Sequence, residues 1–543
     1  MGKKRVAIVG AGASGLPAIR HALLYGFEPV CFECTEHVGG LWRYTPGGTN
    51  VHGHELSCVM KSTVINTSKE MTAFSDFPPP PEYANFMHNT KLWAYFQQYA
   101  EHFGLTNYIK FKHFVKQIQR NDNYDQTGQW KLTYLDADEK EHTEVFDAVL
   151  VATGHHAEPY YPKKWPGQDN FKGEVTHAHN YRDHRNFEDK VVAIVGVGNS
   201  GVDLAVELGR IAKQTYLVSR RGTWVFNRLV EHGMPFDIVL FRRFLLAIRN
   251  ALPFAVTHKF MEMRLNWKFD HSLYGLKPEH GLFSAHPTVN DDLPNRLCNG
   301  TVVVKPNIKE FTKTGLTFED GVTIEPVDHV ILSTGYSLGF PIIENGELVP
   351  ATNNEVTLYK YMYPPQLAKH NTLAIVGLIQ PLGSIMPISE LQVRVFYDVL
   401  SKSSSLPTEE GMQAEIDDKK REMAKQFVHS RRHTIQVDYA SFMDELAEII
   451  GCRPDIKKLA LSDPFLALEV IFGPQSPYTY RINGPHSWEG ARKAILGLQD
   501  RVRKGLAPGG GILRKKEEPS IVQKTSVYLA IIVLILAIWG FFF

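Results

Sequence analysis

Two glycine-rich segments have the spacing of dinucleotide-binding turns. Residues 5–15 read RVAIVGAGASG and residues 191–201 read VVAIVGVGNSG, so each has an apolar strand followed by G-x-G-x-x-G. In this motif the first glycine permits a tight turn, the second lets a pyrophosphate approach the backbone, and the third lets helix and strand pack closely. The phosphates then lie at the positive end of the helix. The residues expected to line the two sites are Gly10, Ala11, Gly12, Ala13, Ser14 and Gly15 in the first and Gly196, Gly198, Ser200, Gly201 and Asp203 in the second.

The residues that end the following strand predict which nucleotide each site binds. In the first unit the strand PVCFE ends in Glu33, whose carboxylate can accept hydrogen bonds from ribose hydroxyls and repels a 2′-phosphate. In the second unit TYLVSRRG has Ser219, Arg220 and Arg221 at this place. Guanidinium groups bind phosphate through charge-assisted, bidentate hydrogen bonds. The first site therefore fits FAD or NAD, and the second fits NADPH.

Two further apolar strands suggest how the domains are arranged. VLVATG and HVILSTG end in small residues at 152–154 and 333–335, and they flank the second glycine motif. This order is typical of an FAD domain that is interrupted by an NADPH domain. We therefore expect an α/β fold with two Rossmann-like dinucleotide-binding domains. The predicted parts are residues 1–158 (FAD domain, first part), 159–331 (NADPH domain with a helical insertion at about 228–285), 332–504 (second part of the FAD domain and C-terminal region), 505–525 (linker) and 526–543 (transmembrane tail anchor).

The end of the sequence is strongly apolar. Residues 527–543 read VYLAIIVLILAIWGFFF and contain no charge. As a helix this stretch would be about 26 Å long, slightly less than a hydrocarbon core of about 30 Å. It predicts a C-terminal transmembrane helix with the catalytic part in the cytosol. The short span favours the thinner endoplasmic reticulum membrane.

Residues 234–269 mix apolar stretches with basic side chains. Such a segment suits a pair of interfacial helices that lie on a membrane with their basic groups toward lipid phosphates. It also suits a packed insertion whose arginines extend their stems over apolar surface. The sequence leaves both interpretations open.

Overall charge and cysteine usage exclude several function classes. The chain has 59 Lys and Arg against 58 Asp and Glu, and this net charge of +1 argues against a nucleic-acid partner. No group of Cys and His residues has the spacing of a metal site. Cys31 and Cys34 form a C-x-x-C, but they flank Glu33 at the adenosine end of the first site, too far from a flavin ring for dithiol exchange. A disulfide reductase is therefore disfavoured.

Several segments resemble one enzyme family. Phe171, Gly173, His177 and Tyr181 match the fingerprint F-x-G-x-x-x-H-x-x-x-[YF] just before the second glycine motif. Other matching segments are GGLW (39–42), KSTVINTSKEM (61–71), HPTVNDDLPNR (286–296), LAIVGLIQPLGSIMP (373–387), VDYASFMDELA (437–447) and GPHSWEGARKAI (484–495). With the apolar tail, the chain resembles the membrane-bound animal flavin-containing monooxygenases, the dimethylaniline monooxygenase (N-oxide-forming) family, over essentially its whole length.

The resemblance implies an NADPH- and O₂-dependent monooxygenase that acts on lipophilic small molecules. NADPH would reduce FAD, O₂ would add at the flavin C4a to give a hydroperoxide, and an amine nitrogen or thioether sulfur would attack its distal oxygen. Asn66 is the implied catalytic residue. Baeyer–Villiger oxygenation of ketones and an NADPH oxidase that releases H₂O₂ remain alternatives, and a homo-oligomer is compatible with the sequence. Further cofactor contacts implied by the resemblance are Gly40, Leu41, Trp42, Asn66, Thr67 and Gln380.

Overall fold

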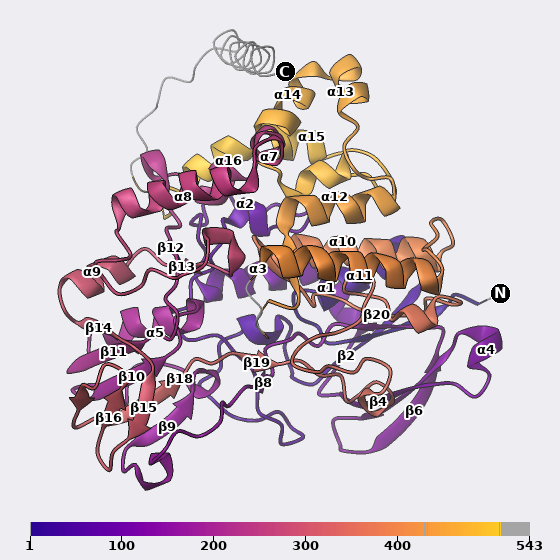
Figure 1. Ribbon diagram of the computed structural model, residues 1–543. Helices are drawn as coiled ribbons and strands as arrows, with labels where there is room; N and C mark the ends of the chain where they lie inside the picture. The colour runs from indigo at the N-terminus through magenta and orange to yellow at the C-terminus, as the bar shows by residue number, and fades with distance from the viewer. Residues whose placement is uncertain (1, 428–430, 432, 510, 512–543) are drawn as a thin grey trace.

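The computed structural model describes residues 2–427, 431, 433–509 and 511 of the chain. Two parallel five-stranded sheets form its lower part in Figure 1. In spatial order the first sheet consists of β20 (Leu373–Ile375), β7 (Ala148–Val151), β1 (Arg5–Val9), β2 (Glu28–Glu33) and β3 (Ile109–Phe111). The second consists of β14 (Val302–Lys305), β11 (Gln214–Val218), β10 (Val191–Val195), β18 (His329–Leu332) and β9 (Glu174–His177).

Both sheets follow the same plan. Helices α1 (Gly15–Leu24) and α5 (Asn199–Leu208) each connect the central strand to its neighbour. The central strands are almost entirely apolar, as expected for parallel strands that are covered on both faces. Each unit also has a three-stranded antiparallel sheet, which in sequence comes before the strand on the other side of the central one, β7 in the first unit and β18 in the second. These sheets are β4 (Phe114–Arg120), β5 (Trp130–Leu135) and β6 (Glu141–Phe146) in the first unit and β15 (Ile308–Phe311), β16 (Leu316–Phe318) and β17 (Thr323–Ile324) in the second.

The last strand of the first sheet comes after the whole second sheet in the sequence. Strand β20 follows the whole second sheet in sequence and pairs in parallel with β7. The chain leaves the first unit through β8 (Glu158–Pro159) and returns through β19 (Tyr336–Ser337), and these two strands pair antiparallel. This connectivity has the interrupted order expected from the sequence, and the predicted domain boundaries stay predictions.

Helices gather at the end of the molecule away from the sheets (Figure 1). The short parallel pair of β12 (Val225–Phe226) and β13 (Thr288–Val289) closes the neck of the helical insertion, which contains α6 (Phe236–Leu240), α7 (Arg243–Ala251) and α8 (Phe254–Lys268). Beyond β20 the main helices are α10 (Ile385–Leu400), α11 (Glu409–Gln426), α12 (Tyr439–Ile449), α13 (Ile456–Ser462), α14 (Pro464–Phe472), α15 (Ala491–Leu496) and α16 (Leu498–Lys504). The remaining helices are α2 (Lys69–Thr72), α3 (Asn89–His102), α4 (Tyr124–Thr127) and α9 (Leu293–Cys298).

Among the described residues, no helix is both long and apolar enough to cross a bilayer. The transmembrane helix predicted at 526–543 lies outside the described residues, and so does most of the predicted linker at 505–525.

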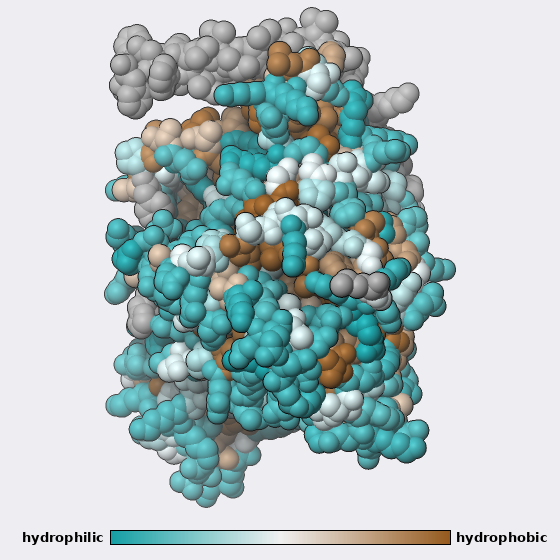
Figure 2. Space-filling model, turned by 90° about the vertical axis from the view of Figure 1, so that its right-hand side faces the viewer, coloured by the Kyte–Doolittle hydropathy of each residue, from teal (hydrophilic) through white to brown (hydrophobic). Residues whose placement is uncertain are grey.

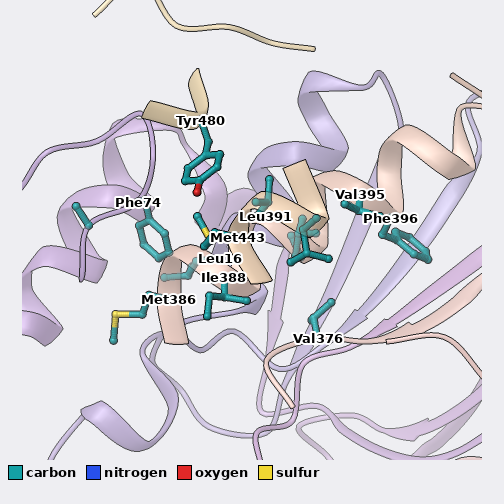
Figure 3. Close-up of a cluster of buried hydrophobic side chains, with 14 of the residues drawn as sticks. Leu16, Phe74, Val376, Met386, Ile388, Leu391, Val395, Phe396, Met443 and Tyr480 are labelled. Atoms are coloured by element: carbon teal, nitrogen blue, oxygen red, sulfur yellow. The ribbon is translucent and has the colours of Figure 1, made fainter. Parts of the chain in front are cut away.

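The largest apolar core joins parts of the chain that are distant in sequence. Leu16 of α1, Phe74, Leu391 of α10 and Met443 of α12 are all buried in it. Figure 3 shows these side chains gathered between the helices. Because α1 carries the first glycine turn and α10 follows β20, this core holds the two parts of the first unit together.

A network of buried charges crosses the same interface. Arg481 donates from Nη2 to Asp76 Oδ2 at 2.6 Å and from Nε to Ser75 Oγ at 2.7 Å. Ser75 in turn donates from its backbone nitrogen and its hydroxyl to the Glu390 carboxylate, both at 2.7 Å. His21 of α1 lies 3.2 Å from Glu390 Oε1, and burial holds the pKa of His21 well below its ordinary value, so its ring is neutral. Arg481 is thus the buried cation nearest to both carboxylates, and Arg20, on a less buried side chain, lies 3.8 Å from Asp76 Oδ2.

We predict that Arg481→Met lowers the free energy of unfolding by about 3–5 kcal/mol, because it removes the buried cation that pairs with Asp76 and lies 3.8 Å from Glu390 Oε1. Urea unfolding of the FAD-loaded protein measures this loss. The control Arg492→Met removes the ion pair with Asp463 from a side chain that is 56% exposed, and it should cost less than about 1 kcal/mol. Equal losses in the two variants would contradict the prediction.

Candidate active site and nucleotide sites

The first glycine turn leaves no room for side chains at two of its three glycines. Gly10 has a φ of +101°, and a Cβ there would lie 2.7 Å from the carbonyl oxygen of Ala152 at the end of β7. A Cβ at Gly15 would lie 1.8 Å from Gly10 O. At Gly12 the nearest atom would be Gly40 Cα, at an ordinary contact distance of 3.6 Å. The turn therefore approaches β7 closely and keeps its middle glycine open at the start of α1, as a bound pyrophosphate requires.

Glu33 lies at the end of β2 beside this turn, where its carboxylate is buried. Its Oε2 accepts a hydrogen bond from Ala11 N at 2.8 Å. Its Oε1 accepts from the backbone nitrogen and the hydroxyl of Thr35, at 2.9 and 2.8 Å. A carboxylate offers about four acceptor positions, so these bonds fix its orientation and leave capacity for a ribose hydroxyl.

Two other segments adjoin the first turn. The 3-10 helix η1 contains the predicted residues Gly40, Leu41 and Trp42, and it follows Gly39, whose N–H donates to Ala11 O at 3.0 Å. After β20 the chain passes over the start of α1, because a Cβ at Gly377 would lie 2.5 Å from Ser14 Oγ. Gln380 begins β21 (Gln380–Leu382) three residues later, and its backbone N–H donates to Ile435 O. Both parts of the first unit thus contribute to one site.

The second glycine turn repeats this geometry. Gly196 has a φ of +119°, and a Cβ there would lie 2.4 Å from Ser333 O at the end of β18. A Cβ at Gly201 would lie 2.1 Å from Gly196 O, whereas one at Gly198 would meet nothing within 4 Å. The open space at Gly198 is at the start of α5, where Ser200 is exposed. The residues present therefore fit a second dinucleotide.

Positive charge follows β11 in this second site. The backbone N–H of Ser219 donates to Lys305 O at 2.8 Å, and its hydroxyl accepts from Gly222 N at 2.9 Å. Arg220 and Arg221 come next and are exposed. Ser219 thus holds the turn, and both guanidinium groups remain accessible to a 2′-phosphate.

Asp203 on α5 has a partner within the protein. Its Oδ1 accepts from Asn290 Nδ2 at 2.9 Å, and burial raises the pKa of Asp203 to about 6. Asn290 Oδ1 accepts from the backbone nitrogens of Asp292 and Leu293 at the start of α9. The carboxyl therefore positions residues 290–293, and its predicted contact with the nucleotide stays a prediction.

Asn66 lies in a loop, residues 65–68, that is held by side chains from the insertion. Arg228 donates from Nη2 to Asn66 Oδ1 at 2.6 Å, and it also donates to Asp291 Oδ1 from its backbone nitrogen at 3.0 Å. Asp237 Oδ2 accepts from Ser68 N at 2.6 Å. The adjacent Thr67 hydroxyl shares a hydrogen bond with Thr72 Oγ1 at 2.8 Å.

The sequence analysis missed Arg228, Asp237 and Asp291. Asp291 belongs to the matching segment 286–296, but nothing in its spacing connects it with Arg228 or with the loop at 65–68. Only the fold brings the three segments together.

Comparison with known proteins identifies the family. A family model described as flavin-binding monooxygenase-like matches residues 3–542. The chain belongs to this family. It is 47% identical to flavin-containing monooxygenase 5 of Rattus norvegicus over 507 residues, which cover 93% of this chain and 94% of the relative. It is 42% identical to flavin-containing monooxygenase 3 of the same organism over 537 residues, 98% of each chain.

The fold is also found among solved structures. The structure of S-allyl-L-cysteine S-oxygenase from Allium sativum has a TM-score of 0.62 and 24% sequence identity, and it matches 91% of this chain and 99% of its own. The family resemblance and the expected function are confirmed. This flavin-binding monooxygenase is an enzyme that uses FAD, NADPH and O₂ to oxygenate heteroatom-containing substrates.

We predict that Arg220→Ala raises the KM for NADPH about tenfold and leaves the KM for NADH nearly unchanged. The reason is that only NADPH has the 2′-phosphate, and a lost charge-assisted hydrogen bond has an effect of this size. Steady-state kinetics with both nucleotides measures the difference. Arg210→Ala, which removes an exposed ion pair with Asp292 on the same domain, is the control. An equal loss for both nucleotides would disprove the assignment.

Proposed function

We propose that Asn66 is the residue through which this enzyme directs oxygen to lipophilic amines and thioethers. When bound, FAD that has been reduced by NADPH supplies the activation of O₂. The chain must then orient its groups at the reacting centre and exclude water. An amide suits this task because it donates a hydrogen bond and does not titrate.

The contact between Arg228 and Asn66 carries this proposal. The guanidinium occupies the oxygen end of the amide at 2.6 Å, so the NH₂ group remains as an oriented, neutral donor. The glycine turn, η1 and the segment after β20, which includes Gln380, would hold the cofactor. Thr67 lies in the loop next to Asn66 and shares a hydrogen bond with Thr72. The residue roles are supported by this placement and by the family membership.

We predict that Asn66→Ala lowers the yield of sulfoxide per NADPH consumed by roughly 100-fold, the effect of removing one oriented donor at a reacting centre. Released H₂O₂ should then account for nearly all of the NADPH consumed, since each uncoupled turnover yields one H₂O₂. Product analysis with a methyl sulfide and a long-chain ketone, side by side, measures the yield. Asn299→Ala on an exposed loop is the matched control.

Three other results would contradict the proposal. If Asn66→Ala still forms nearly one sulfoxide per NADPH consumed, Asn66 has no role in directing the oxygen. Ester formation from the ketone in excess of sulfoxide would favour Baeyer–Villiger chemistry. Wild-type enzyme that yields only H₂O₂ would favour an oxidase.

We propose, further, that one end of the molecule lies on a membrane. Val256, Phe260, Met263 and Trp267 of α8 are exposed at spacings of four, three and four residues, so they form one apolar stripe, in which Trp267 is 94% exposed. Helix α7 packs against α14 through Phe244 and Phe472, whose ring centroids are 5.2 Å apart. Leu461, near the end of the neighbouring α13, is 90% exposed.

The helices that carry these exposed apolar residues lie close to one another in the fold. Helices α7, α8, α13 and α14 share one end of the molecule in Figure 1, and Figure 2 shows hydrophobic surface toward that end. The uncharged residues 526–543 would add an anchor, which we assign to the endoplasmic reticulum membrane, with the described part in the cytosol. Lipophilic substrates would then reach the enzyme from the bilayer.

The arginines of the insertion contribute less than the sequence suggested. Arg243 donates to both oxygens of Asp444, at 2.6 and 2.9 Å, and Arg249 donates to Asp438 Oδ2 at 2.8 Å. Arg264 pairs with Glu231. Because these charges are compensated within the protein, we expect apolar contact to dominate membrane binding.

We predict that a chain that ends at residue 525 still sediments with neutral phosphatidylcholine vesicles. Addition of 0.5 M NaCl, which shortens the Debye length to about 4 Å, should change this binding little. The double variant Phe260→Ser and Trp267→Ser should weaken binding about tenfold or more, because two large apolar side chains lose their burial. Leu273→Ser, at an exposed leucine outside the stripe, is the control. A truncated chain that stays in the supernatant would contradict membrane contact by α8.

A further inference from the structure

The chain enters the helical insertion through a hairpin formed by residues 228–237. Leu229 and Pro235 form an antiparallel bridge. Phe236 N donates to Arg228 O, and Val230 N donates to Met234 O, both at 2.9 Å. The hairpin therefore places its first residue, Arg228, beside Phe236, the residue before its last one, Asp237.

Both ends of this hairpin contact the loop 65–68, with opposite charge. The Arg228 guanidinium donates from Nε to Ile65 O at 3.4 Å and from Nη2 to Asn66 Oδ1 at 2.6 Å. The Asp237 carboxylate, which is fully buried, accepts from Ser68 N at 2.6 Å. The Arg228 guanidinium thus donates to two oxygen acceptors of the loop, and the Asp237 carboxylate accepts from one of its backbone N–H groups.

Arg228 determines which end of the Asn66 amide faces it. A guanidinium carries only donors, so the amide oxygen must turn toward it and the NH₂ group must turn away. An asparagine amide has an acceptor oxygen on one side and an NH₂ donor on the other, so a partner that only donates distinguishes its two orientations. Arg228 is itself fixed, because Asp291 accepts from its backbone nitrogen at 3.0 Å and from Nη1 at 3.3 Å.

We infer that the hairpin 228–237 is a clamp that positions Asn66 for the reaction. Arg228 selects the orientation of the amide, and Asp237 holds the backbone of the loop two residues further on. Both are positioning residues that act through Asn66. The inference rests on the role proposed above for Asn66, and it adds that the insertion, whose Arg228 is held by Asp291, sets the geometry of that residue.

The experiment is a double-mutant cycle on the full-length, FAD-loaded enzyme in detergent. It compares Asn66→Ala, Arg228→Met and the double variant, with Arg228→Lys as a conservative replacement that keeps a charged donor. Two quantities are measured: the yield of sulfoxide per NADPH, and the visible circular dichroism of the oxidised flavin in the absence of NADPH. His232→Asn, at the exposed tip of the same hairpin, is the matched control.

We expect Arg228→Met to lower the yield about tenfold, as for the loss of a charge-assisted hydrogen bond. Arg228→Lys should stay within about threefold of the wild type, since its ammonium can still donate to Asn66 Oδ1. The double variant should be no worse than Asn66→Ala. The dichroism should change in the same direction in Asn66→Ala and Arg228→Met, and His232→Asn should match the wild type in both measurements.

Additive losses in the double variant would overturn the inference, because Arg228 would then act independently of Asn66. An unchanged Arg228→Met beside an impaired Asn66→Ala would overturn it as well. An unimpaired Asn66→Ala would instead disprove the proposed function. If Arg228→Met retains no FAD, the same comparison uses Asp237→Asn, which keeps an acceptor for Ser68 N and should match the wild type, against Asp237→Leu, which should not.

Discussion

The carbonyl oxygens of Ala152 and Ser333 leave no space for a side chain at the first glycine of each turn, and the arrangement of the two units depends on this contact. Each oxygen ends the strand beside a central strand, 2.7 Å from a Cβ at Gly10 and 2.4 Å from one at Gly196. The backbone that leaves these two strand ends forms β8 and β19, which pair with each other. The same close approach that admits a pyrophosphate thus also places the connection between the two units beside both nucleotide sites.

The proposed reacting centre around Asn66 is built from segments that are distant in sequence. The cofactors carry the oxidation and reduction, so the chain has to supply orientation rather than acid–base chemistry. The groups around Asn66 come from residues 65–68, 228–237 and 290–292. Buried ionised groups there have partners of opposite charge or backbone donors, as low-dielectric surroundings require. The insertion accordingly belongs to the proposed active site as well as to the outer surface.

What the sequence could predict depended on local spacing. The glycine turns and the charge that follows each second strand depend on residues less than 30 positions apart, and the structure shows both with the expected geometry. The pairing of Arg228 with Asn66 joins residues 162 positions apart, and the contact of Arg481 with Asp76 spans 405. No pattern of residue spacing along the sequence indicates which of such distant residues will be in contact. The arginines of the insertion illustrate the same limit, because composition displays their charge but not the acidic residues that compensate it.

The insertion connects the apolar stripe of α8 to Asn66 by a short path. Arg264 of α8 pairs with Glu231 at the tip of the hairpin 228–237, and the two ends of that hairpin contact the loop 65–68. Hydrogen bonds across the hairpin keep Arg228 and Phe236 together, and β12 with β13 closes the neck behind them. A segment tied at the tip, at both ends and at the neck has little freedom to move independently of the nucleotide domains. The stripe on α8 is therefore held on a packed support, and its apolar side chains stay exposed instead of packing against the rest of the protein.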